Sequence, residues 1–299
     1  MINIVVNAPQ RRGEDGLQLA QEFAGHIVHQ FKTKFPGIKA VAQMAPNAND
    51  LLSVKIVGAE PADRKMLKRL LMHQGMMRLY LDRLNNSVVD VDTNCKISKR
   101  ILREIAENRD GIKFATTFFI QTARCTWLDA MATLARMYEC GQRRNATVNI
   151  RWMLEYIRGN YDDLYQYPLY DYHFDPPKLG VEPALSRDEI DGHLRLLEKW
   201  EEKGGVISKL AEYRNLLLFH NNRQFFADPT KFPQDKWLGS DEVTQLLAKA
   251  TEILKQCYTA FTGRSTDLDV STAEDVDQVF RRLREHREWK SGGNTLPAT

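Results

Sequence analysis

Residues 214–220 read RNLLLFH, an arginine and a histidine that enclose four apolar residues. Three leucines and a phenylalanine belong in a hydrophobic core, whereas Arg214 and His220 are groups suited to phosphate chemistry. On a straight helix, six positions correspond to about 120° of rotation and about 9 Å of rise, so the two side chains do not meet. A site that uses both therefore requires a bent helix or a second copy of the chain in a two-fold dimer.

The residue types in this stretch are suited to phosphodiester cleavage in RNA. His220 titrates near neutral pH and is able to accept a proton from a ribose 2′-hydroxyl or to donate one to a leaving 5′-oxygen. The fork of Arg214 matches phosphate oxygens and stabilises the charge of a phosphorane. We expect Asn215 to position the pair, and Asn221 and Arg223 to contact the substrate. This chemistry requires no metal or cofactor, and an attacking 2′-hydroxyl restricts it to RNA.

The composition is that of a globular chain without a membrane segment. Hydrophobic residues make up 43% and charged residues 27% of the chain, and no apolar run reaches the roughly 20 residues of a membrane helix. The net charge of +3 does not by itself indicate a nucleic-acid binder, and the surplus lies within residues 1–95. We see no cationic signal region and no CxxC pair, so we expect reduced thiols and a cytoplasmic protein.

The first third of the chain has the pattern of a small α/β domain. Short β-branched runs predict strands at residues 2–6, 38–44, 51–57 and 87–91. Apolar residues at helical spacing predict a helix at 17–31 and a longer one that starts at Pro61. The order β-α-β-β-α-β is that of a ferredoxin-like sandwich, which we assign to residues 1–95.

From residue 96 onward the pattern is helical, so the chain as a whole is predicted to be α+β. Helical periods recur as far as residue 290, and residues 291–299 are expected to form a flexible tail. Ser186 and Glu189 have the spacing of a capping box at the start of one helix. Gly204 and Gly205 mark a bend or a join between two helices.

In this helical context, RNLLLFH resembles the R-[N/D]-x4-H signature of HEPN domains, in particular the AbiU-type abortive-infection branch. TWLDAMATLARMYE (126–139) and RNATVNIRWMLEYI (144–157) are similar to an earlier segment of that branch. The resemblance covers about residues 97–265 and implies a dimeric helical bundle with metal-independent ribonuclease activity in a defence or toxin–antitoxin system. It also implies that Arg214 and His220 are the catalytic pair and that Asn215 is their polar follower.

Some roles stay open. Asn222 stands where the branch often has an acidic residue, and Glu139 is a minor candidate for a supporting acid. Apart from the resemblance, Arg214 and His220 also fit an ordinary helix end, with the histidine near the C-terminal dipole and the arginine paired to a carboxylate. A non-catalytic scaffold for dimerisation or RNA binding, and a regulatory partner such as an antitoxin, are therefore alternatives to the enzyme.

Three further clusters have both a functional and a structural interpretation. Lys65 and Arg69, on the helix after Pro61, form either an RNA- or partner-binding face or a solvated face over a core stripe. His26 and His29 lack a further nearby ligand, so a helix face is favoured and no metal is expected. Tyrosines between 161 and 172 either stack on bases or pack in a loop. The expected partners are an RNA substrate, a second copy, and an antitoxin or defence protein at the N-terminal domain.

Overall fold

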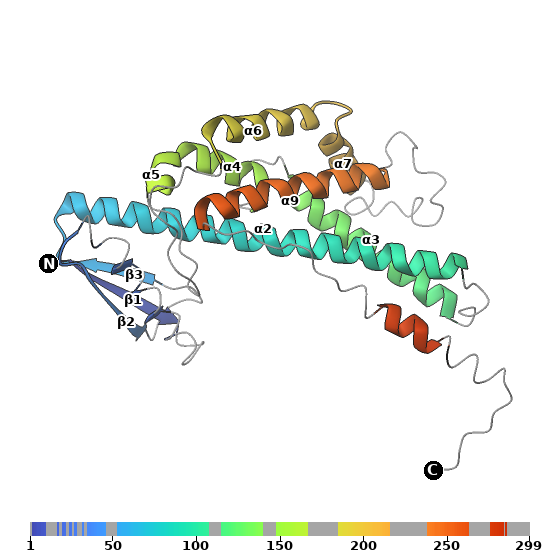
Figure 1. The fold of residues 1–299 in the computed structure, drawn as a ribbon, viewed down its shortest axis with the longest axis horizontal. Coiled ribbons are helices and arrows are strands. Elements are labelled where there is room, and N and C mark those ends of the chain that lie inside the picture. The colour runs from blue at the N-terminus through green and yellow to red at the C-terminus, as the bar shows by residue number, and fades with distance from the viewer. Residues whose placement is uncertain are drawn as a thin grey trace, which may run out of the picture. The chain divides into compact units, whose positions relative to one another are not determined.

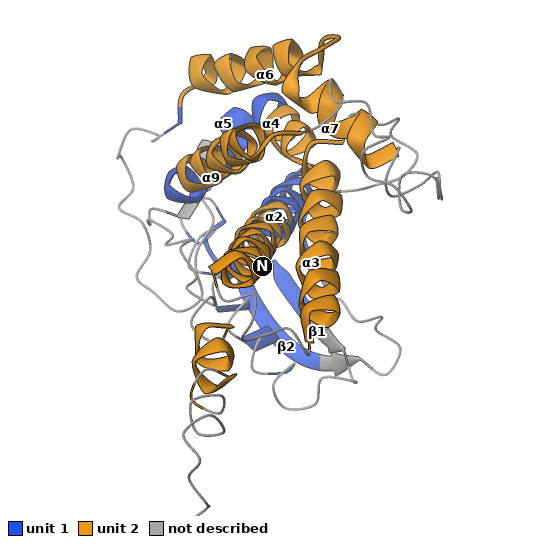
Figure 2. Cartoon of the chain, turned by 90° about the vertical axis from the view of Figure 1, so that its right-hand side faces the viewer, with its two compact units in different colours: residues 1–79, 157–185, 258–264 blue, residues 80–156, 186–257, 265–299 orange. Residues whose placement is uncertain are grey.

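The structure is a computed structural model, drawn as a ribbon in Figure 1. It describes residues 2–9, 35–45, 53–107, 115–139, 148–166, 185–215, 238–262, 276–283 and 285, with single residues between 17 and 32. The chain divides into two compact units, which are coloured separately in Figure 2. Unit 1 consists of residues 1–79, 157–185 and 258–264, and unit 2 consists of residues 80–156, 186–257 and 265–299.

Unit 1 contains a three-stranded sheet. Its strands are β1 (Asn3–Pro9), β2 (Lys39–Ala45) and β3 (Ser53–Val57), close to three of the ranges expected from the sequence. The middle strand, β1, is parallel to β2 and antiparallel to β3. Two adjacent parallel strands need a crossover connection, which is usually a helix, and the described residues between 17 and 28 are helical.

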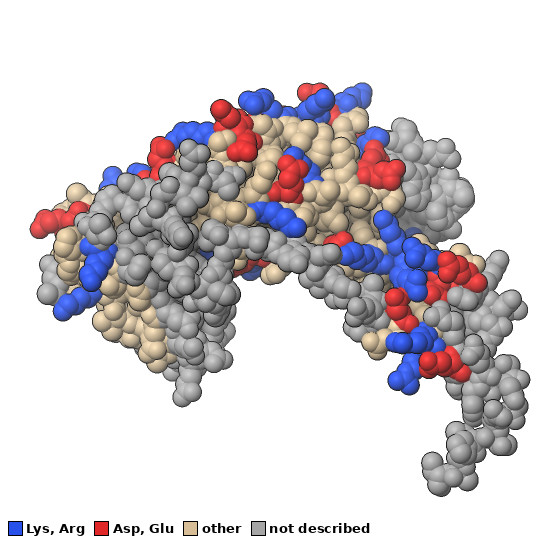
Figure 3. Space-filling view, in the orientation of Figure 1, with Lys and Arg blue, Asp and Glu red and all other residues tan. Residues whose placement is uncertain are grey.

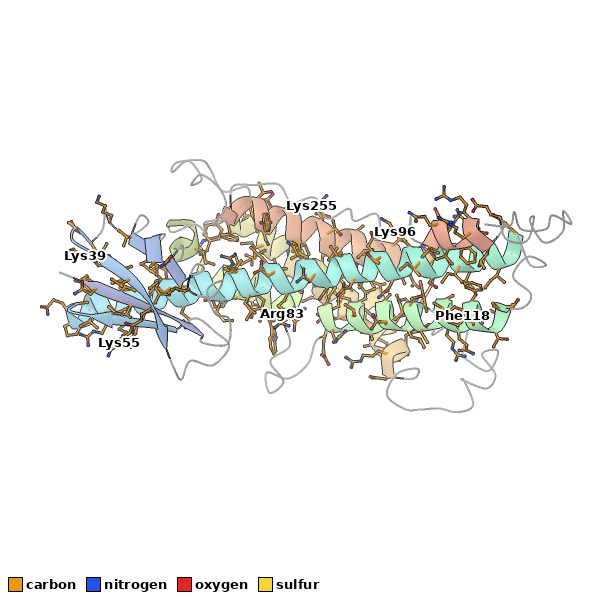
Figure 4. The ribbon with its side chains drawn as sticks, turned by 90° about the horizontal axis from the view of Figure 1, so that it is seen from below. Lys39, Lys55, Arg83, Lys96, Phe118 and Lys255 are labelled. Atoms are coloured by element: carbon orange, nitrogen blue, oxygen red, sulfur yellow. The ribbon has the colours of Figure 1, made fainter. Side chains whose placement is uncertain are left out.

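Side chains alternate across this sheet, as the period of a strand requires. Ile4 and Ile56 point into a core that they share with apolar residues of the 17–28 segment and of the first part of helix α2 (Pro61–Glu107). On the strand residues outside this core, Val41 is 60% exposed, and Lys39 and Lys55 are exposed on β2 and β3 (Figure 4). The sheet is therefore packed through one set of alternate residues and solvated through the other.

The described sheet does not confirm the ferredoxin-like topology. A ferredoxin-like chain has four strands and a split first βαβ unit. Here β1 and β2 are direct neighbours in the order β2-β1-β3, and the fourth expected strand, at residues 87–91, is helical. The coarser expectation, a small N-terminal sheet followed by a helical region, agrees with the structure.

Residues 87–91, SVVDV, lie inside α2, a helix of 47 residues. Its buried residues in this region recur at the three- and four-residue spacing of a helix: Leu84, Val88, Val91 and Cys95. The valines favour a strand by local propensity, but packing at helical period outweighs that preference. The strand expected here is therefore wrong, and the domain boundary expected at residue 95 falls within a continuous helix.

The described elements of unit 2 are helices, labelled in Figure 1. Besides the second part of α2, they are α3 (Thr116–Met137), most of α4 (Ile150–Gly159), α6 (Arg187–Glu201), α7 (Val206–Arg214) and most of α9 (Ser240–Thr262). The short α5 (Tyr161–Gln166) belongs to unit 1. Each of these unit 2 helices buries apolar side chains, for example Leu134, Leu154, Leu194, Leu210 and Leu254. None of the helices in the described residues is both long and apolar enough to cross a membrane.

The start of α6 and its junction with α7 follow the sequence signals. Ser186 accepts a hydrogen bond from the backbone N–H of Glu189, and the Glu189 carboxylate accepts one from the backbone N–H of Ser186, so the expected capping box is confirmed. The chain turns at Gly204, whose φ of +85° favours glycine, and α7 begins after Gly205. This turn fixes where α7 starts, and therefore where Arg214 lies at its end.

A second small core lies at the other end of α2. Phe280, from the helical residues 276–283, packs against Phe119 of α3 with ring centroids 4.9 Å apart. Arg100 of α2 forms ion pairs with Glu104 and with Asp277. The helix near residue 280, which the sequence predicted, is thus attached to α2 and α3 by both apolar and ionic contacts.

Candidate functional site

Arg214 is the last residue of α7, a helix that is firmly anchored in unit 2. Val206, Ile207, Leu210 and Tyr213 are buried, so one side of this short helix is fixed by packing. The next residue, Asn215, has helical backbone angles of −62° and −42°. The arginine is consequently presented from a rigid element, and its backbone leads on into the rest of the RNLLLFH segment.

The guanidinium of Arg214 is held by a carboxylate from a distant part of the sequence. Arg214 Nη1 donates to Oε1 of Glu139 at 2.9 Å, and the arginine and glutamate side chains are 20% and 30% exposed. Nε and Nη2 of Arg214 both approach Oδ1 of Asn215 at 3.3 Å. Both neighbours accept hydrogen bonds from the guanidinium, so they fix its plane while its positive charge stays near the surface.

Two more contacts attach α7 to its neighbours. Trp127 Nε1 of α3 donates to the hydroxyl of Tyr213 at 3.2 Å, and burial raises the pKa of Tyr213, so this phenol stays neutral. Lys209 Nζ lies 2.7 Å from Oε1 of Glu242 in α9. Burial favours the neutral acid at Glu242, but the hydrogen bonds from Lys209 and from a backbone N–H outweigh it and lower the pKa. Arg214 is therefore positioned by helices α3 and α9 as well as by α7.

A cavity of about 310 Å³ lies beside Arg214 within unit 2. Its lining residues come from the end of α3, the end of α6 and the length of α7: Ala135, Tyr138, Glu139, Glu201, Ile207, Ser208, Leu210, Ala211, Glu212, Arg214 and Asn215. Four of these side chains are aliphatic, and the other seven carry hydrogen-bonding groups. The cavity therefore places a fixed guanidinium and several other hydrogen-bonding groups beside a small aliphatic surface.

Three of the predicted site residues, His220, Asn221 and Arg223, lie outside the described residues, as does Asn222. The guanidinium of Arg214 contacts Oδ1 of the adjacent Asn215. The roles of these residues, including the pairing of Arg214 with His220, stay predictions.

Lys65 and Arg69 lie on α2 in unit 1, where both are exposed. The Arg69 guanidinium pairs with the carboxylate of Asp163 in α5, and His73 Nε2 is 3.4 Å from the same carboxylate. Burial lowers the pKa of His73 despite this acidic neighbour. The charge of Arg69 is thus partly neutralised within unit 1, whereas Lys65 has no such contact with another described residue.

The other groups of residues singled out in the sequence either make contacts within the fold or lie outside the residues that the structure describes. His26, His29 and the side chains of tyrosines 165–172 are not described, whereas Tyr161 donates to the carbonyl of Leu185 at 3.0 Å. Glu242 accepts a hydrogen bond from the backbone N–H of Gly239 at 2.8 Å, so residues 239–243 (GSDEV) form the start of α9. Among the residues that the structure places, no group of three His, Cys, Asp or Glu side chains has the arrangement of a metal site.

Glu139 is only a minor candidate in the sequence, and no sequence pattern indicates the cavity. Glu139 stands directly after α3 and is 75 residues from Arg214, so only the fold reveals their contact. Glu201, which receives two hydrogen bonds from Arg151 at 2.7 and 2.9 Å, was not a candidate at all. Basic and acidic side chains are interspersed on the face in Figure 3, so composition alone would not have located the site.

Comparison with protein families gives a match to a family model. Residues 82–279 match the model HEPN_AbiU2, whose description is AbiU2. This range spans about two thirds of the chain and includes Glu139, Arg214 and the RNLLLFH segment. Neither a curated protein nor a solved structure matches the chain.

Proposed function

The chain belongs to the HEPN AbiU2 family of abortive-infection type, and we propose that it is a metal-independent endoribonuclease of a defence or toxin–antitoxin system. The observation that carries this proposal is the guanidinium of Arg214, which Glu139 holds at 2.9 Å beside a cavity of about 310 Å³. A fixed guanidinium at the edge of a small-ligand cavity is what recognition of a phosphate and its attached nucleoside requires.

In this proposal His220 is the general acid and base. It removes the proton of the ribose 2′-hydroxyl, whose oxygen then attacks the adjacent phosphorus, and a proton is delivered to the leaving 5′-oxygen. Arg214 stabilises the charge on the phosphorane oxygens, and Asn215 positions the guanidinium. The products are a 2′,3′-cyclic phosphate and a free 5′-hydroxyl, and no water or metal takes part in this step.

We further propose that the site is shared between two copies of the chain. Arg214 and His220 are six residues apart, which separates them on a straight helix, so the guanidinium of one copy and the imidazole of the other form the functional pair. Asn221 and Arg223 follow the histidine and contact the same RNA. Lys65 and Arg69 offer additional phosphate contacts in unit 1, and the N-terminal segment binds an antitoxin or defence partner.

A direct assay tests this function. The purified full chain is incubated with RNA in the presence of EDTA, beside His220→Ala. The expected result is cleavage by the wild type, products with cyclic phosphate ends, and a rate at least about 100-fold lower for the variant. A substrate with one 2′-deoxy nucleotide resists cleavage at that position, because the nucleophile is missing. Equal cleavage by wild type and variant would remove the catalytic role of His220.

A second candidate function has support from the same ion pair. Bonds from Arg214 to Glu139 and Asn215 are also those of a structural arginine at a helix end. In that case the chain is a scaffold for dimerisation or RNA binding that does not cleave RNA. The folded protein is then expected to bind RNA and to leave it intact under every condition tested.

A further inference from the structure

We propose that the cavity beside Arg214 binds a guanine base, so that RNA is recognised at a guanosine next to the phosphate held by Arg214. This inference rests on the proposed ribonuclease function and adds a base preference to it. The cavity volume of about 310 Å³ is at the lower end of the range of small-ligand pockets, about 300–1,000 Å³. Such a volume suits one nucleoside and not a longer RNA segment.

The apolar part of the cavity is suited to the flat face of a base. It is lined by Ala135, Ile207, Leu210 and Ala211, together with Tyr138. The hydroxyl of Tyr138 donates to the carbonyl of Leu246 in α9 at 2.7 Å, so its polar end is directed to that helix. Aliphatic and aromatic walls of this kind contact bases without regard to their identity. Discrimination between bases must come from the polar lining.

Two carboxylates in the lining are fixed by arginines through one oxygen each. Glu139 accepts from Arg214 at Oε1, and Glu201 accepts from Arg151 at Oε1. Within the described part of the chain, every contact of these two carboxylates ends on Oε1. The second oxygen of each glutamate is therefore available as an acceptor for a ligand in the cavity. Because Glu139 already positions Arg214, Glu201 is the residue that we assign to base recognition.

A carboxylate selects guanine by the chemistry of the base edges. The Watson–Crick edge of guanine presents two adjacent donors, N1–H and the 2-amino group. Adenine and cytosine present one amino donor beside an unprotonated ring nitrogen, and uracil presents one N–H between two carbonyl oxygens. These lone pairs repel a carboxylate oxygen, whereas guanine directs two adjacent donors at it, and the free oxygen of Glu201 is able to accept from both. A site built from hydrogen-bond acceptors rejects analogues that lack the matching donors.

Glu198 provides a matched control for Glu201. Both lie near the end of α6, and both approach Arg151, Glu201 at 2.7 Å and Glu198 at 3.6 Å. Glu198 is more exposed and does not line the cavity. Replacing either glutamate with glutamine removes one carboxylate from Arg151, but only Glu201→Gln changes the acceptors inside the cavity.

The test measures nucleotide binding by the full chain, which needs no cleavage. Guanosine 3′-monophosphate and inosine 3′-monophosphate differ only in the 2-amino group, and calorimetry gives the Kd of each. The wild type and Glu198→Gln are expected to bind the guanosine nucleotide about tenfold more tightly. In Glu201→Gln the two nucleotides bind equally. Should Glu201→Gln fail to fold, Ala211→Leu fills the cavity and is expected to weaken both nucleotides.

Several outcomes would overturn the inference. Equal binding of the two nucleotides by the wild type would do so, and so would a preference that persists in folded Glu201→Gln. Binding of arginine amide, with no binding of either nucleotide, would assign the cavity to a cationic side chain of a protein partner instead. Because binding is also measured in His220→Ala, the two proposals separate. Cleavage without base preference would contradict only the proposed guanine site. Guanine binding without cleavage would contradict only the proposed ribonuclease activity.

Discussion

Glu139 and Arg214, 75 residues apart in sequence, lie with Oε1 and Nη1 2.9 Å from each other. The glutamate follows the end of α3, and the arginine ends α7. Since α7 is also attached to α3 through Trp127 and Tyr213, the carboxylate and the guanidinium are held by the same pair of packed helices. Glu139 therefore acts as a positioning residue for Arg214 in the proposed reaction.

The first prediction concerns this positioning role. Glu139→Gln keeps the size of the side chain but removes the charge that fixes the guanidinium. We expect the cleavage rate constant to fall about 10- to 100-fold, because small displacements of a catalytic group are costly. The loss is expected in kcat more than in KM, and rates over a range of RNA concentrations separate the two.

Glu252→Gln is the matched control for this variant. Glu252 pairs with Lys249 on α9 at 2.8 Å, a similar contact at residues that do not line the cavity. Its replacement is expected to leave kcat and KM unchanged. A rate increase in Glu139→Gln would mean that the glutamate withholds Arg214 from RNA instead of positioning it.

The capping box of α6 gives a prediction about stability. Ser186→Ala removes the side-chain acceptor for the backbone N–H of Glu189, and we expect the free energy of unfolding to decrease by about 1 kcal/mol. Ser186→Thr retains a hydroxyl that both accepts from the backbone N–H and donates to the Glu189 carboxylate, and it is expected to lose much less. Urea unfolding followed by circular dichroism measures both. A loss of the same size in the two variants would show that capping is not the cause.

The same box predicts a pH dependence. Hydrogen bonds from the backbone and hydroxyl of Ser186 lower the pKa of Glu189. A carboxyl whose pKa is lowered by folding adds stability above its unfolded pKa of about 4.3, and this contribution is lost as the pH falls through the folded pKa. The difference between wild type and Ser186→Ala is therefore expected to be full at pH 7 and to shrink below about pH 4.

The salt dependence of RNA binding distinguishes the phosphate contacts proposed for Lys65 and Arg69 in unit 1. Lys65 is exposed on α2, and Lys65→Ala is expected to reduce the slope of log Kobs against log salt for single-stranded RNA by about 0.7. Arg69→Ala is expected to change it less, because Asp163 already neutralises part of the charge. Lys255 on α9, also exposed, serves as the control (Figure 4). Equal salt slopes for Lys65→Ala and Lys255→Ala would contradict the proposed contact between unit 1 and RNA.

Local sequence patterns predicted the structure correctly where that structure depends only on residues nearby in the chain. The capping box at Ser186 needs only a partner three residues later, and the turn at Gly204 needs only a residue that tolerates a φ of +85°. Pro61 is the first residue of α2, the place where a missing N–H costs nothing. These features were predicted correctly for that reason.

Local sequence patterns did not predict the structure where tertiary packing determines it. The valines at 87–91 have strand propensity, yet the buried face of a 47-residue helix includes Val88 and Val91. The cavity and its carboxylates come from α3, α6 and α7, which are separate in sequence, so no local pattern identifies Glu201. The RNLLLFH segment drew attention to Arg214, but its partner Glu139 is revealed only by the packing of α3 against α7.

Complementation between two inactive variants tests the shared site most directly. Arg214→Ala and His220→Ala chains, carrying different tags, are co-expressed, and the heterodimer is purified through both tags before RNA cleavage is measured. Each parent homodimer is expected to be inactive, whereas the heterodimer has one intact and one doubly deficient site and should regain about half of the wild-type rate. A pure heterodimer that remains as inactive as its parents would contradict a site shared between two copies.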